Sequence, residues 1–353
     1  MDPIARFPHA GNRRGDPRAA GRYASTFEGQ PAGGGSAARS GATMTPRPNV
    51  PPHQKARILA EALPFIRAYH ATTIVVRLGG EAMADPALKE GFARDVALLR
   101  LVGMNPIVVH GGGWRIDALL QQMGIPIRRH RDLRVTDEAT MNVVEMVLDE
   151  LNQELVGLIN RHGGRAIGLN GQDGRFIHGK PTARLAGDTD VDVGFVGDVE
   201  RIDVDLVNLL LSRGFIPVVM PIGVGDDGTA YHINSDVVAG KLARTMHAEK
   251  LVLMTNVEGV RGRDGKLAYV LTAAEAEGLL GDGSIDSDMR PRLTAALDAV
   301  REGVRSVHII DGGVPSALLL EVLTADGVGT ALQSDAGPHF LDDSRSYFAG
   351  QLG

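Results

Sequence analysis

Apolar positions along the chain alternate between two periodicities, which predicts alternating strands and helices. Short apolar runs bounded by Gly, Pro or Asp are typical of buried strands, and longer segments with apolar residues three and four positions apart are typical of helices. We expect strands at 73–78, 106–110, 165–169, 215–221, 250–255 and 305–310. We expect helices at 86–103, 113–122, 137–161, 203–213, 235–247, 272–280, 288–303 and 315–323. This order predicts an α/β fold whose parallel sheet is covered by helices on both faces.

The remaining segments complete the expected organisation. Residues 1–52 are rich in Gly, Ala, Pro and Arg without apolar periodicity, which predicts a disordered N-terminal extension, with Met44 as an alternative start. Helical spacing predicts a helix over 54–70, and Thr136 is the expected N-cap of the helix at 137–161. Residues 335–353 form a polar tail. Three polar stretches indicate hairpins beside the sheet, at 174–180, 191–202 and 227–233.

Composition narrows the class of protein. The 353 residues are 43% hydrophobic and 23% charged, which suits one large globular α/β domain or two lobes. A net charge of −6 and an aromatic content of 4% argue against a nucleic-acid partner. The absence of cysteine excludes disulfides and thiolate chemistry, and it fits a cytoplasmic protein. No apolar run approaches the roughly 18–20 residues that span a bilayer, so we expect no membrane partner.

Two of the expected strands run directly into glycine. The strand at 73–78 is followed by Gly79 and Gly80, and the strand at 106–110 is followed by glycines at 111–113. Glycine at the carboxyl end of a strand permits a tight turn and leaves N–H groups free to bind an anion. The alternative is that both are merely tight corners. Two such turns from one parallel sheet, with Arg77 beside the first, predict a cradle for a phosphoryl group.

Other patterns indicate no dinucleotide fingerprint and no metal site. The stretch 223–228 satisfies G-x-G-x-x-G after a strand, but the residues that follow do not open an apolar helix. We therefore interpret it as a turn leading to a hairpin. The sequence contains no G-x-x-x-x-G-K-[ST] loop, and its histidines have no metal-ligand spacing.

Several polar residues have both a structural and a functional interpretation. Asp236 near the start of the helix at 235–247 either stabilises the helix dipole or holds two cationic side chains in place. Arg134 precedes a capped helix, and arginine suits bidentate binding of a carboxylate. The turn after 250–255 is suited to line a nucleotide pocket. Arg292 brings a cation to the start of another helix. Trp114 either has a packing role or forms a wall of the acceptor pocket.

Seven strings point to a known family. They are HGGG at 110–113, LRVTD at 133–137, GFIPVVMPIGVG at 214–225, INSD at 233–236, VEGV at 257–260, ALDAVREGV at 296–304 and ALLLEVLTADGVGT at 317–330. On these strings the chain, from about 54 to 332, resembles the amino-acid kinase family and, within it, the acetylglutamate kinases of arginine biosynthesis.

The resemblance implies a three-layer αβα sandwich with a mostly parallel sheet of about eight strands. It implies an acylamino-acid-binding lobe at 71–247 and a nucleotide-binding lobe at 248–334. The reaction implied is transfer of the γ-phosphoryl group of ATP, which brings its own Mg²⁺, to the side-chain carboxylate of N-acetyl-L-glutamate or a close analogue. The helix at 53–70 resembles the oligomerisation and effector element of hexameric, arginine-inhibited members, which implies a homo-oligomer, dimer or hexamer.

Site residues carry over from the family by position. The catalytic residues implied are Arg77, Asp236 and Arg292. Phosphate-binding glycines are Gly79, Gly80, Gly111, Gly112 and Gly113. Residues implied to bind the acylamino acid are Arg134, His232 and Asn234. Residues implied to bind the nucleotide are Thr255, Asn256, Gly259 and Met289. The effector region includes Glu321 and Gly329, but Gly313 and Ser316 replace an arginine and a histidine of the family there, so inhibition by arginine is left open.

Two departures from the family leave alternatives open. Arg77 and Arg292 stand where the family has the lysines that stabilise the transition state, and arginine keeps the charge but is longer and planar. The first hypothesis is a kinase of the acetylglutamate type. The alternative is a catalytically impaired relative that acts as a regulatory or binding protein. A kinase of aspartate or carbamate is disfavoured by the string around Arg134 and by the block at 214–236.

Overall fold

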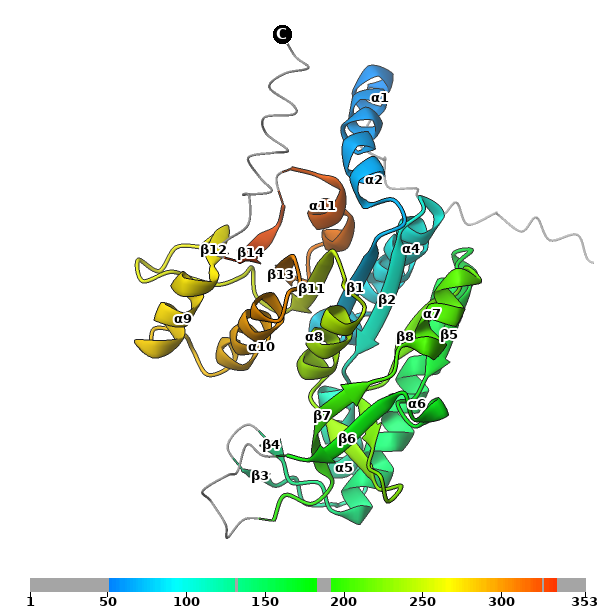
Figure 1. Cartoon of the computed structure of the whole chain (residues 1–353), viewed down its shortest axis with the longest axis vertical. Coiled ribbons are helices and arrows are strands. Elements are labelled where there is room, and N and C mark those ends of the chain that lie inside the picture. The colour runs from blue at the N-terminus through cyan, green and yellow to red at the C-terminus, as the bar shows by residue number, and fades with distance from the viewer. Residues whose placement is uncertain (1–50, 131–132, 183–191, 326, 335–353) are drawn as a thin grey trace, which may run out of the picture. The chain divides into compact units, whose positions relative to one another are not determined.

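The computed structural model describes residues 51–130, 133–182, 192–325 and 327–334, which belong to one compact unit (Figure 1). The polar tail at 335–353 and the predicted disordered extension, apart from Pro51 and Pro52, lie outside the described residues. Within the described residues, no helix combines the length and apolar character needed to cross a membrane.

One eight-stranded sheet runs through the unit, as predicted. Its strand order is β12-β14-β13-β11-β1-β2-β8-β5. Neighbouring strands are parallel, except that β13 and β14 are antiparallel. The strands are β1 (Thr73–Leu78), β2 (Asn105–His110), β5 (Ala166–Leu169), β8 (Ile216–Val219), β11 (Lys250–Thr255), β12 (Val270–Thr272), β13 (Ser306–Asp311) and β14 (Gly329–Gln333).

Helices cover both faces of this sheet and make three layers. The helices are α1 (Pro52–Glu61), α2 (Leu63–Tyr69), α3 (Glu81–Ala84), α4 (Pro86–Leu101), α5 (Gly113–Gln122), α6 (Glu138–Arg161), α7 (Asp205–Ser212), α8 (Ser235–Thr245), α9 (Ala273–Gly281), α10 (Met289–Arg301) and α11 (Ala317–Leu323), with a 3₁₀ turn at Asp173–Arg175. Buried side chains of α4, α6 and α11 pack on one face, and those of α7 to α10 pack on the other. The three-layer αβα sandwich is therefore confirmed.

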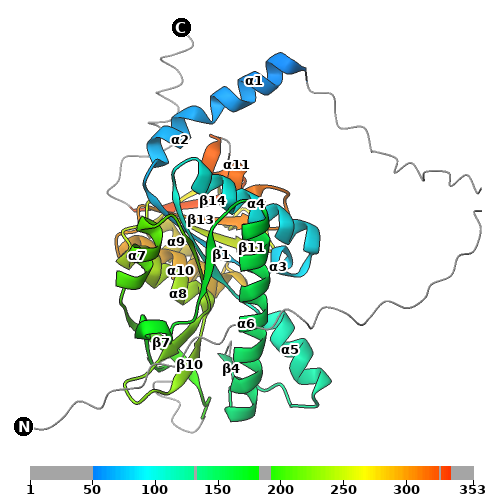
Figure 2. The same cartoon turned by 90° about the vertical axis from the view of Figure 1, so that its right-hand side faces the viewer.

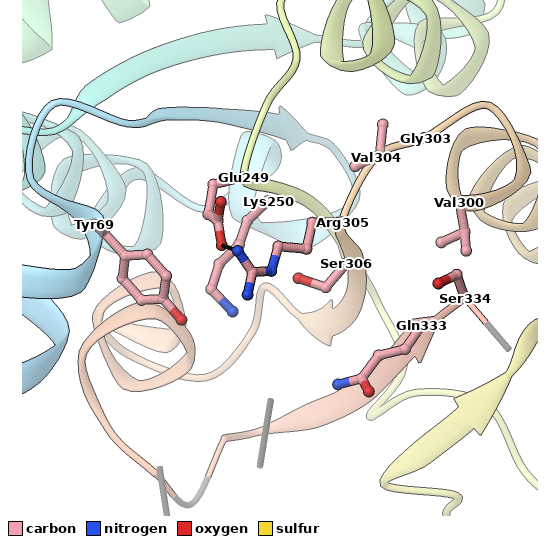
Figure 3. A pocket seen from close by; sticks show the side chains of 10 residues that line it. All are labelled: Tyr69, Glu249, Lys250, Val300, Gly303, Val304, Arg305, Ser306, Gln333 and Ser334. Atoms are coloured by element: carbon pink, nitrogen blue, oxygen red, sulfur yellow. Dashed lines mark ion pairs between the residues drawn. The ribbon is translucent and has the colours of Figure 1, made fainter. Parts of the chain in front are cut away.

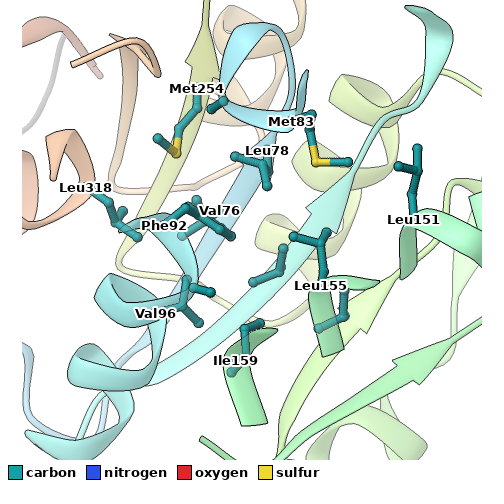
Figure 4. Close-up of a cluster of buried hydrophobic side chains, with 14 of the residues drawn as sticks. Val76, Leu78, Met83, Phe92, Val96, Leu151, Leu155, Ile159, Met254 and Leu318 are labelled. Carbon is teal, nitrogen blue, oxygen red and sulfur yellow. The ribbon is translucent and has the colours of Figure 1, made fainter. Parts of the chain in front are cut away.

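The central strand shows why the sheet is buried on both sides. Side chains alternate between the two faces of a strand. Ile74, Val76 and Leu78 of β1 belong to the cluster under α4 and α6, whereas Val75 belongs to the cluster under α8 and α10. Figure 4 shows Val76 and Leu78 among the side chains of the first cluster. The next position on the α8 face is Arg77, which is not apolar.

The predicted hairpins join into a separate small barrel. Four strands close on each other: β6 (Ile177–Pro181), β7 (Val196–Ile202), β9 (Ile222–Val224) and β10 (Ala230–Ile233). The pair β9–β10 is antiparallel, which confirms that the G-x-G-x-x-G stretch turns into a hairpin. A two-stranded ribbon, β3 (Arg129–His130) and β4 (Leu133–Arg134), is also present. In both views the barrel and α1 lie at opposite ends of the unit (Figures 1 and 2).

Two local predictions were wrong. The helix expected over 54–70 is two helices that meet at Ala62, because Pro64 lies in the first turn of α2 and cannot donate a backbone hydrogen bond in a continuous helix. The N-cap of α6 is Asp137, whose carboxylate accepts from the Thr140 N–H at 3.0 Å. Thr136 instead donates its hydroxyl hydrogen to the Arg134 carbonyl at 2.9 Å.

Truncation of a core side chain on α6 is expected to destabilise the sheet packing. Leu155 is fully buried, whereas Met146 on the same helix is 56% exposed. We expect Leu155→Ala to lower the free energy of unfolding by about 2–5 kcal/mol because it leaves a cavity. Met146→Ala, the matched control, should change it by less than about 0.5 kcal/mol. Urea denaturation followed by circular dichroism measures both, and equal losses would contradict the assigned packing.

Candidate active site

A pocket of about 630 Å³ opens at the carboxyl ends of β1 and β2. Ligands of open α/β sheets bind at this edge, where loops leave the strands. The pocket is lined by eleven of the residues that the sequence singled out for the site, which are Arg77, Gly79, Gly80, Gly111, Gly112, Gly113, His232, Asn234, Asp236, Arg292 and Trp114. The structure thus brings the two glycine turns and three charged side chains into one space.

Arg77 is held in the pocket by three groups from two elements. Its Nε donates to Ser235 Oγ at 3.1 Å and lies 2.8 Å from Asp236 Oδ1, both on α8. Its Nη1 donates to the Met254 carbonyl of β11 at 3.2 Å. The side chains of Arg77 and Asp236 are only 13% and 7% exposed. The guanidinium therefore has one well-defined position near the end of β1.

That position lies against both glycine turns. A Cβ on Gly79 would overlap the guanidinium of Arg77, and a Cβ on Gly111 would lie 3.8 Å from its Nη2. Any side chain at Gly79 would therefore displace Arg77. The Arg77 guanidinium therefore lies beside both turns, and the binding of a phosphoryl group between them stays a prediction.

The pairing of Asp236 leaves one carboxylate oxygen without a donor. The single Nε–H of Arg77 is directed to Ser235, so Asp236 Oδ1 is paired by charge but accepts no hydrogen bond in the part of the chain that the structure describes. A buried acceptor without a donor costs about 1–3 kcal/mol. Arg292, the other cation predicted to be oriented by Asp236, lines the same pocket but donates to the Asp288 carbonyl at 2.8 Å. The orientation of two cations by Asp236 stays a prediction.

The second glycine turn is shaped by two helices. Gly112 caps the N-terminus of α5, and helix N-termini attract anions. A Cβ on Gly112 would lie 2.9 Å from Leu148 Cδ2 of α6, so close packing requires glycine there. The Gly111 N–H already donates to the Leu78 carbonyl at 3.1 Å, so this residue does not offer the free N–H that we expected of it. In the first turn, Gly80 has a φ of +66°, which favours glycine.

Residues predicted to bind the acylamino acid lie in and beside the pocket. Asn234 caps α8, and its side-chain oxygen accepts from the Asp236 N–H at 2.7 Å. His232 on β10 lines the pocket, and burial, together with the nearby charge of Arg134, lowers the pKa of its imidazole to about 4. His232 is therefore neutral near pH 7. Arg134 is buried just behind the lining, where its Nη2 donates to the Gly113 carbonyl at 3.0 Å and to Asp117 Oδ1 at 2.6 Å.

Sequence reasoning missed some of the lining. Arg129 on β3 reaches the pocket and pairs with Asp117 Oδ2 at 2.7 Å. A two-residue strand carries no periodicity, so nothing in the sequence distinguished Arg129 from the basic residues around it. Ser235 stands within the recognised INSD string and was not given a role. Ser287 and Pro291 were missed at the start of α10.

The predicted nucleotide residues do not line the pocket. Thr255 ends β11, next to β1, and its hydroxyl donates to the Val257 carbonyl at 3.0 Å. Asn256 lies against Gly80, since a Cβ on that glycine would overlap its side chain. Met289 is one turn before Arg292 on α10. Gly259 has a φ of +152°, a backbone conformation that favours glycine. The predicted effector residues lie elsewhere, around β13 and β14.

Metal-ligating side chains do not gather among the described residues: no group of three or more His, Asp or Glu there could hold a metal ion. The charged lining of the pocket includes three arginines, Arg77, Arg129 and Arg292. The three arginines outnumber the two aspartates of the lining, Asp236 and Asp288, and arginine suits phosphate and carboxylate groups.

Comparison with known proteins identifies the fold and the family. The profile of the Amino acid kinase family matches residues 72–311. The chain is 58% identical over 283 residues to acetylglutamate kinase of Chromobacterium violaceum, which covers 80% of this chain and 98% of that protein.

Solved structures share the same architecture. N-acetylglutamate synthase of Neisseria gonorrhoeae, solved with coenzyme A and N-acetyl-glutamate, is 26% identical with a TM-score of 0.72, covering 80% of this chain and 64% of that one. Carbamate kinase of Giardia lamblia, bound to AMP-PNP, is 15% identical with a TM-score of 0.58, covering 75% of this chain and 99% of that one, and shares the fold. The chain belongs to the amino acid kinase family and, within it, to the acetylglutamate kinases.

Proposed function

We propose that this protein transfers the γ-phosphoryl group of ATP to the side-chain carboxylate of N-acetyl-L-glutamate, as a cytoplasmic homo-oligomer. The observation that carries the proposal is the Arg77 guanidinium, anchored by α8 and β11 against the Gly79 and Gly111 turns. The identity of 58% to an acetylglutamate kinase over almost its full length supports this substrate.

The chemistry requires alignment and charge neutralisation more than a protein nucleophile. A carboxylate oxygen of the acceptor attacks the γ-phosphorus, the bond to the β–γ bridging oxygen breaks, and ADP leaves with its electron pair. No proton transfer is needed. Charge spreads over the oxygens of the migrating group, and nearby cations and backbone N–H groups stabilise it. Arg77 supplies the cation, and the N-terminus of α5 at Gly112 and Gly113 faces the same space.

The nucleotide and its metal fit the charge of the lining. ATP enters with Mg²⁺ on its phosphates, and the cation partly neutralises them. Thr255, Asn256, Gly259 and Met289 bind the nucleotide beside the pocket, on the side formed by β11 and α10. Arg292, at the start of α10, is the second cation for the phosphates.

The acylamino acid occupies the side of the pocket formed by the barrel and α5. Asn234 and neutral His232 offer hydrogen bonds to the acylamino group. Arg134 and Arg129 share Asp117, so their positive charges converge beside Gly113. That convergence suits the α-carboxylate of the acceptor.

The arginine at position 77 is compatible with an active kinase. Arginine is longer than lysine, but Ser235, Asp236 and the Met254 carbonyl hold its planar head at the end of β1. This geometry favours the active kinase over the impaired regulatory protein.

Removal of the Arg77 charge is expected to abolish most turnover. In a coupled assay of ADP release with ATP and N-acetyl-L-glutamate, we expect Arg77→Ala to lower kcat by about 10³-fold or more, because a transition-state cation is lost. The control is Arg213→Ala, which changes an exposed arginine at the end of α7. No turnover by the wild type, or unchanged kcat in Arg77→Ala, would reject the proposal.

Alanine substitutions at two adjacent glycines are expected to have different effects, on stability at Gly112 and on turnover at Gly111. Gly112→Ala should lower the free energy of unfolding by about 1–3 kcal/mol, because the new methyl group collides with Leu148. A Cβ at position 111 would lie 3.4 Å from Ser235 Oγ and 3.8 Å from Arg77 Nη2, which are ordinary contact distances, so Gly111→Ala should change stability by less than about 1 kcal/mol. The Gly111 methyl group enters the cradle, and we expect kcat to fall by about 10²-fold. A Gly111→Ala enzyme with full activity would place the phosphoryl group elsewhere.

We also propose Glu321 and Gly329 as part of an effector region. Glu321 is buried, accepts from the Val328 N–H at 2.7 Å, and bonds His308 Nδ1 at 2.5 Å. His308 Nε2 contacts Lys250 Nζ at 3.0 Å. Lys250 lines a further pocket together with Tyr69 of α2, where Figure 3 also shows the Glu249–Arg305 ion pair. The N-terminal helices are thus linked to Glu321 through buried polar groups.

Calorimetric titration with L-arginine tests this effector region. We expect saturable heat with the wild type and at least about tenfold weaker binding by Glu321→Gln, because the negative charge that holds the network is removed. Glu277→Gln, an exposed change on α9, is the control. Absence of heat with the wild type would remove the effector assignment and leave the kinase proposal intact.

A further inference from the structure

A second cavity lies between α4, α11 and the loop that follows β13. Its volume is about 320 Å³. Much of its wall is apolar and includes Leu88, Phe92, Met254, Val314 and Ala317. Figure 4 shows Phe92 and Met254 in the adjoining core cluster. None of the residues that line the candidate active site lines this cavity.

Two carboxylates line this cavity, Asp95 and Glu90, and Asp95 is the buried one. The side chain of Asp95, on the inner face of α4, is 2% exposed. Its Oδ1 accepts a long hydrogen bond of 3.5 Å from Ser316 Oγ and lies 3.8 Å from Arg94 Nη2. Among the described residues, these are its only polar partners. A buried carboxylate normally has shorter and more numerous bonds, because desolvation of the charge is costly.

The neighbouring charges do not neutralise Asp95. The Arg94 side chain is 60% exposed and donates to Ser316 Oγ at 3.2 Å, so its charge is screened by water. Glu90, also in the lining, is paired with His162 at 2.6 Å and with Arg161 at 3.3 Å on α6. Burial raises the pKa of Asp95 to about 6, so most of its carboxyl groups are ionised at pH 7. The cavity therefore contains a negative charge whose pairing within the chain is weak.

We propose that this cavity is a binding site for a small organic cation, a guanidinium or primary ammonium group on a short apolar arm. The cationic head pairs with Asp95, and the arm packs against Leu88, Phe92 and Met254. Both partners gain, because the head replaces a long hydrogen bond with a charged one and the arm leaves water. The two pockets share no lining residue, but Met254 joins them: it lines this cavity, and its carbonyl accepts a hydrogen bond from Arg77 in the candidate active site.

Calorimetric titration of the full chain with n-propylguanidinium tests the site. The neutral n-propylurea has nearly the same shape and is the ligand control. We expect saturable binding of the cation by the wild type, at least tenfold weaker binding of the urea, and at least tenfold weaker binding of the cation by Asp95→Asn. The matched control is Asp149→Asn, an exposed aspartate on α6, which should bind like the wild type.

A second variant tests the cavity without touching the charge. Ala87 is exposed at the edge of the lining, and Ala87→Trp places an indole over the cavity while the core stays unchanged. We expect this variant to unfold at the wild-type urea concentration and to bind the cation at least tenfold more weakly. Absence of saturable binding by the wild type, or equal affinity in the wild type and Asp95→Asn, would overturn the proposal.

Discussion

The buried pair of Arg77 and Asp236 is the interaction on which the candidate active site depends. A charge with 13% exposure is tolerated only beside an opposite charge and hydrogen-bond acceptors. Strand β1 supplies the cation, and α8, more than 150 positions later in the chain, supplies both the carboxylate and Ser235. The carbonyl of Met254 on β11 completes the set. Three elements are thereby joined at the carboxyl edge of the sheet.

The position of the Arg77 guanidinium explains the need for glycine at position 79, and the packing of α6 explains it at position 112. The guanidinium occupies the space that a side chain at Gly79 would need, and α6 occupies the space at Gly112. Both turns line the pocket at a place where a cation is already positioned. Such preorganised charge is worth more than charge that must move during the reaction. Arg129 and the start of α10 line the same pocket.

The sequence predicted the main sheet well because its strands are short apolar runs. It did not predict β12 and β14, since three- and five-residue strands at the end of a sheet carry little periodicity. The barrel was read as separate hairpins because closure depends on pairing between β7 and β10, which is not local. In the site, the glycine patterns singled out Gly79 and Gly112, which line the pocket, and their role in binding phosphate stays a prediction. Arg134 was predicted, but its partner Asp117 and the neighbouring Arg129 were missed because ion pairs between a helix and two short strands leave no sequence signal.

Chemical rescue tests most directly whether the guanidinium of Arg77 acts on the transferred group. The measurement is kcat of Arg77→Ala for ATP and N-acetyl-L-glutamate with increasing guanidinium ion, compared with urea as the neutral control. A cation that binds between Ser235, Asp236 and the glycine turns should restore turnover in a saturable manner, and urea should not. Failure of guanidinium to raise kcat above the level with urea, in a variant that still binds ATP, would contradict the role given to Arg77.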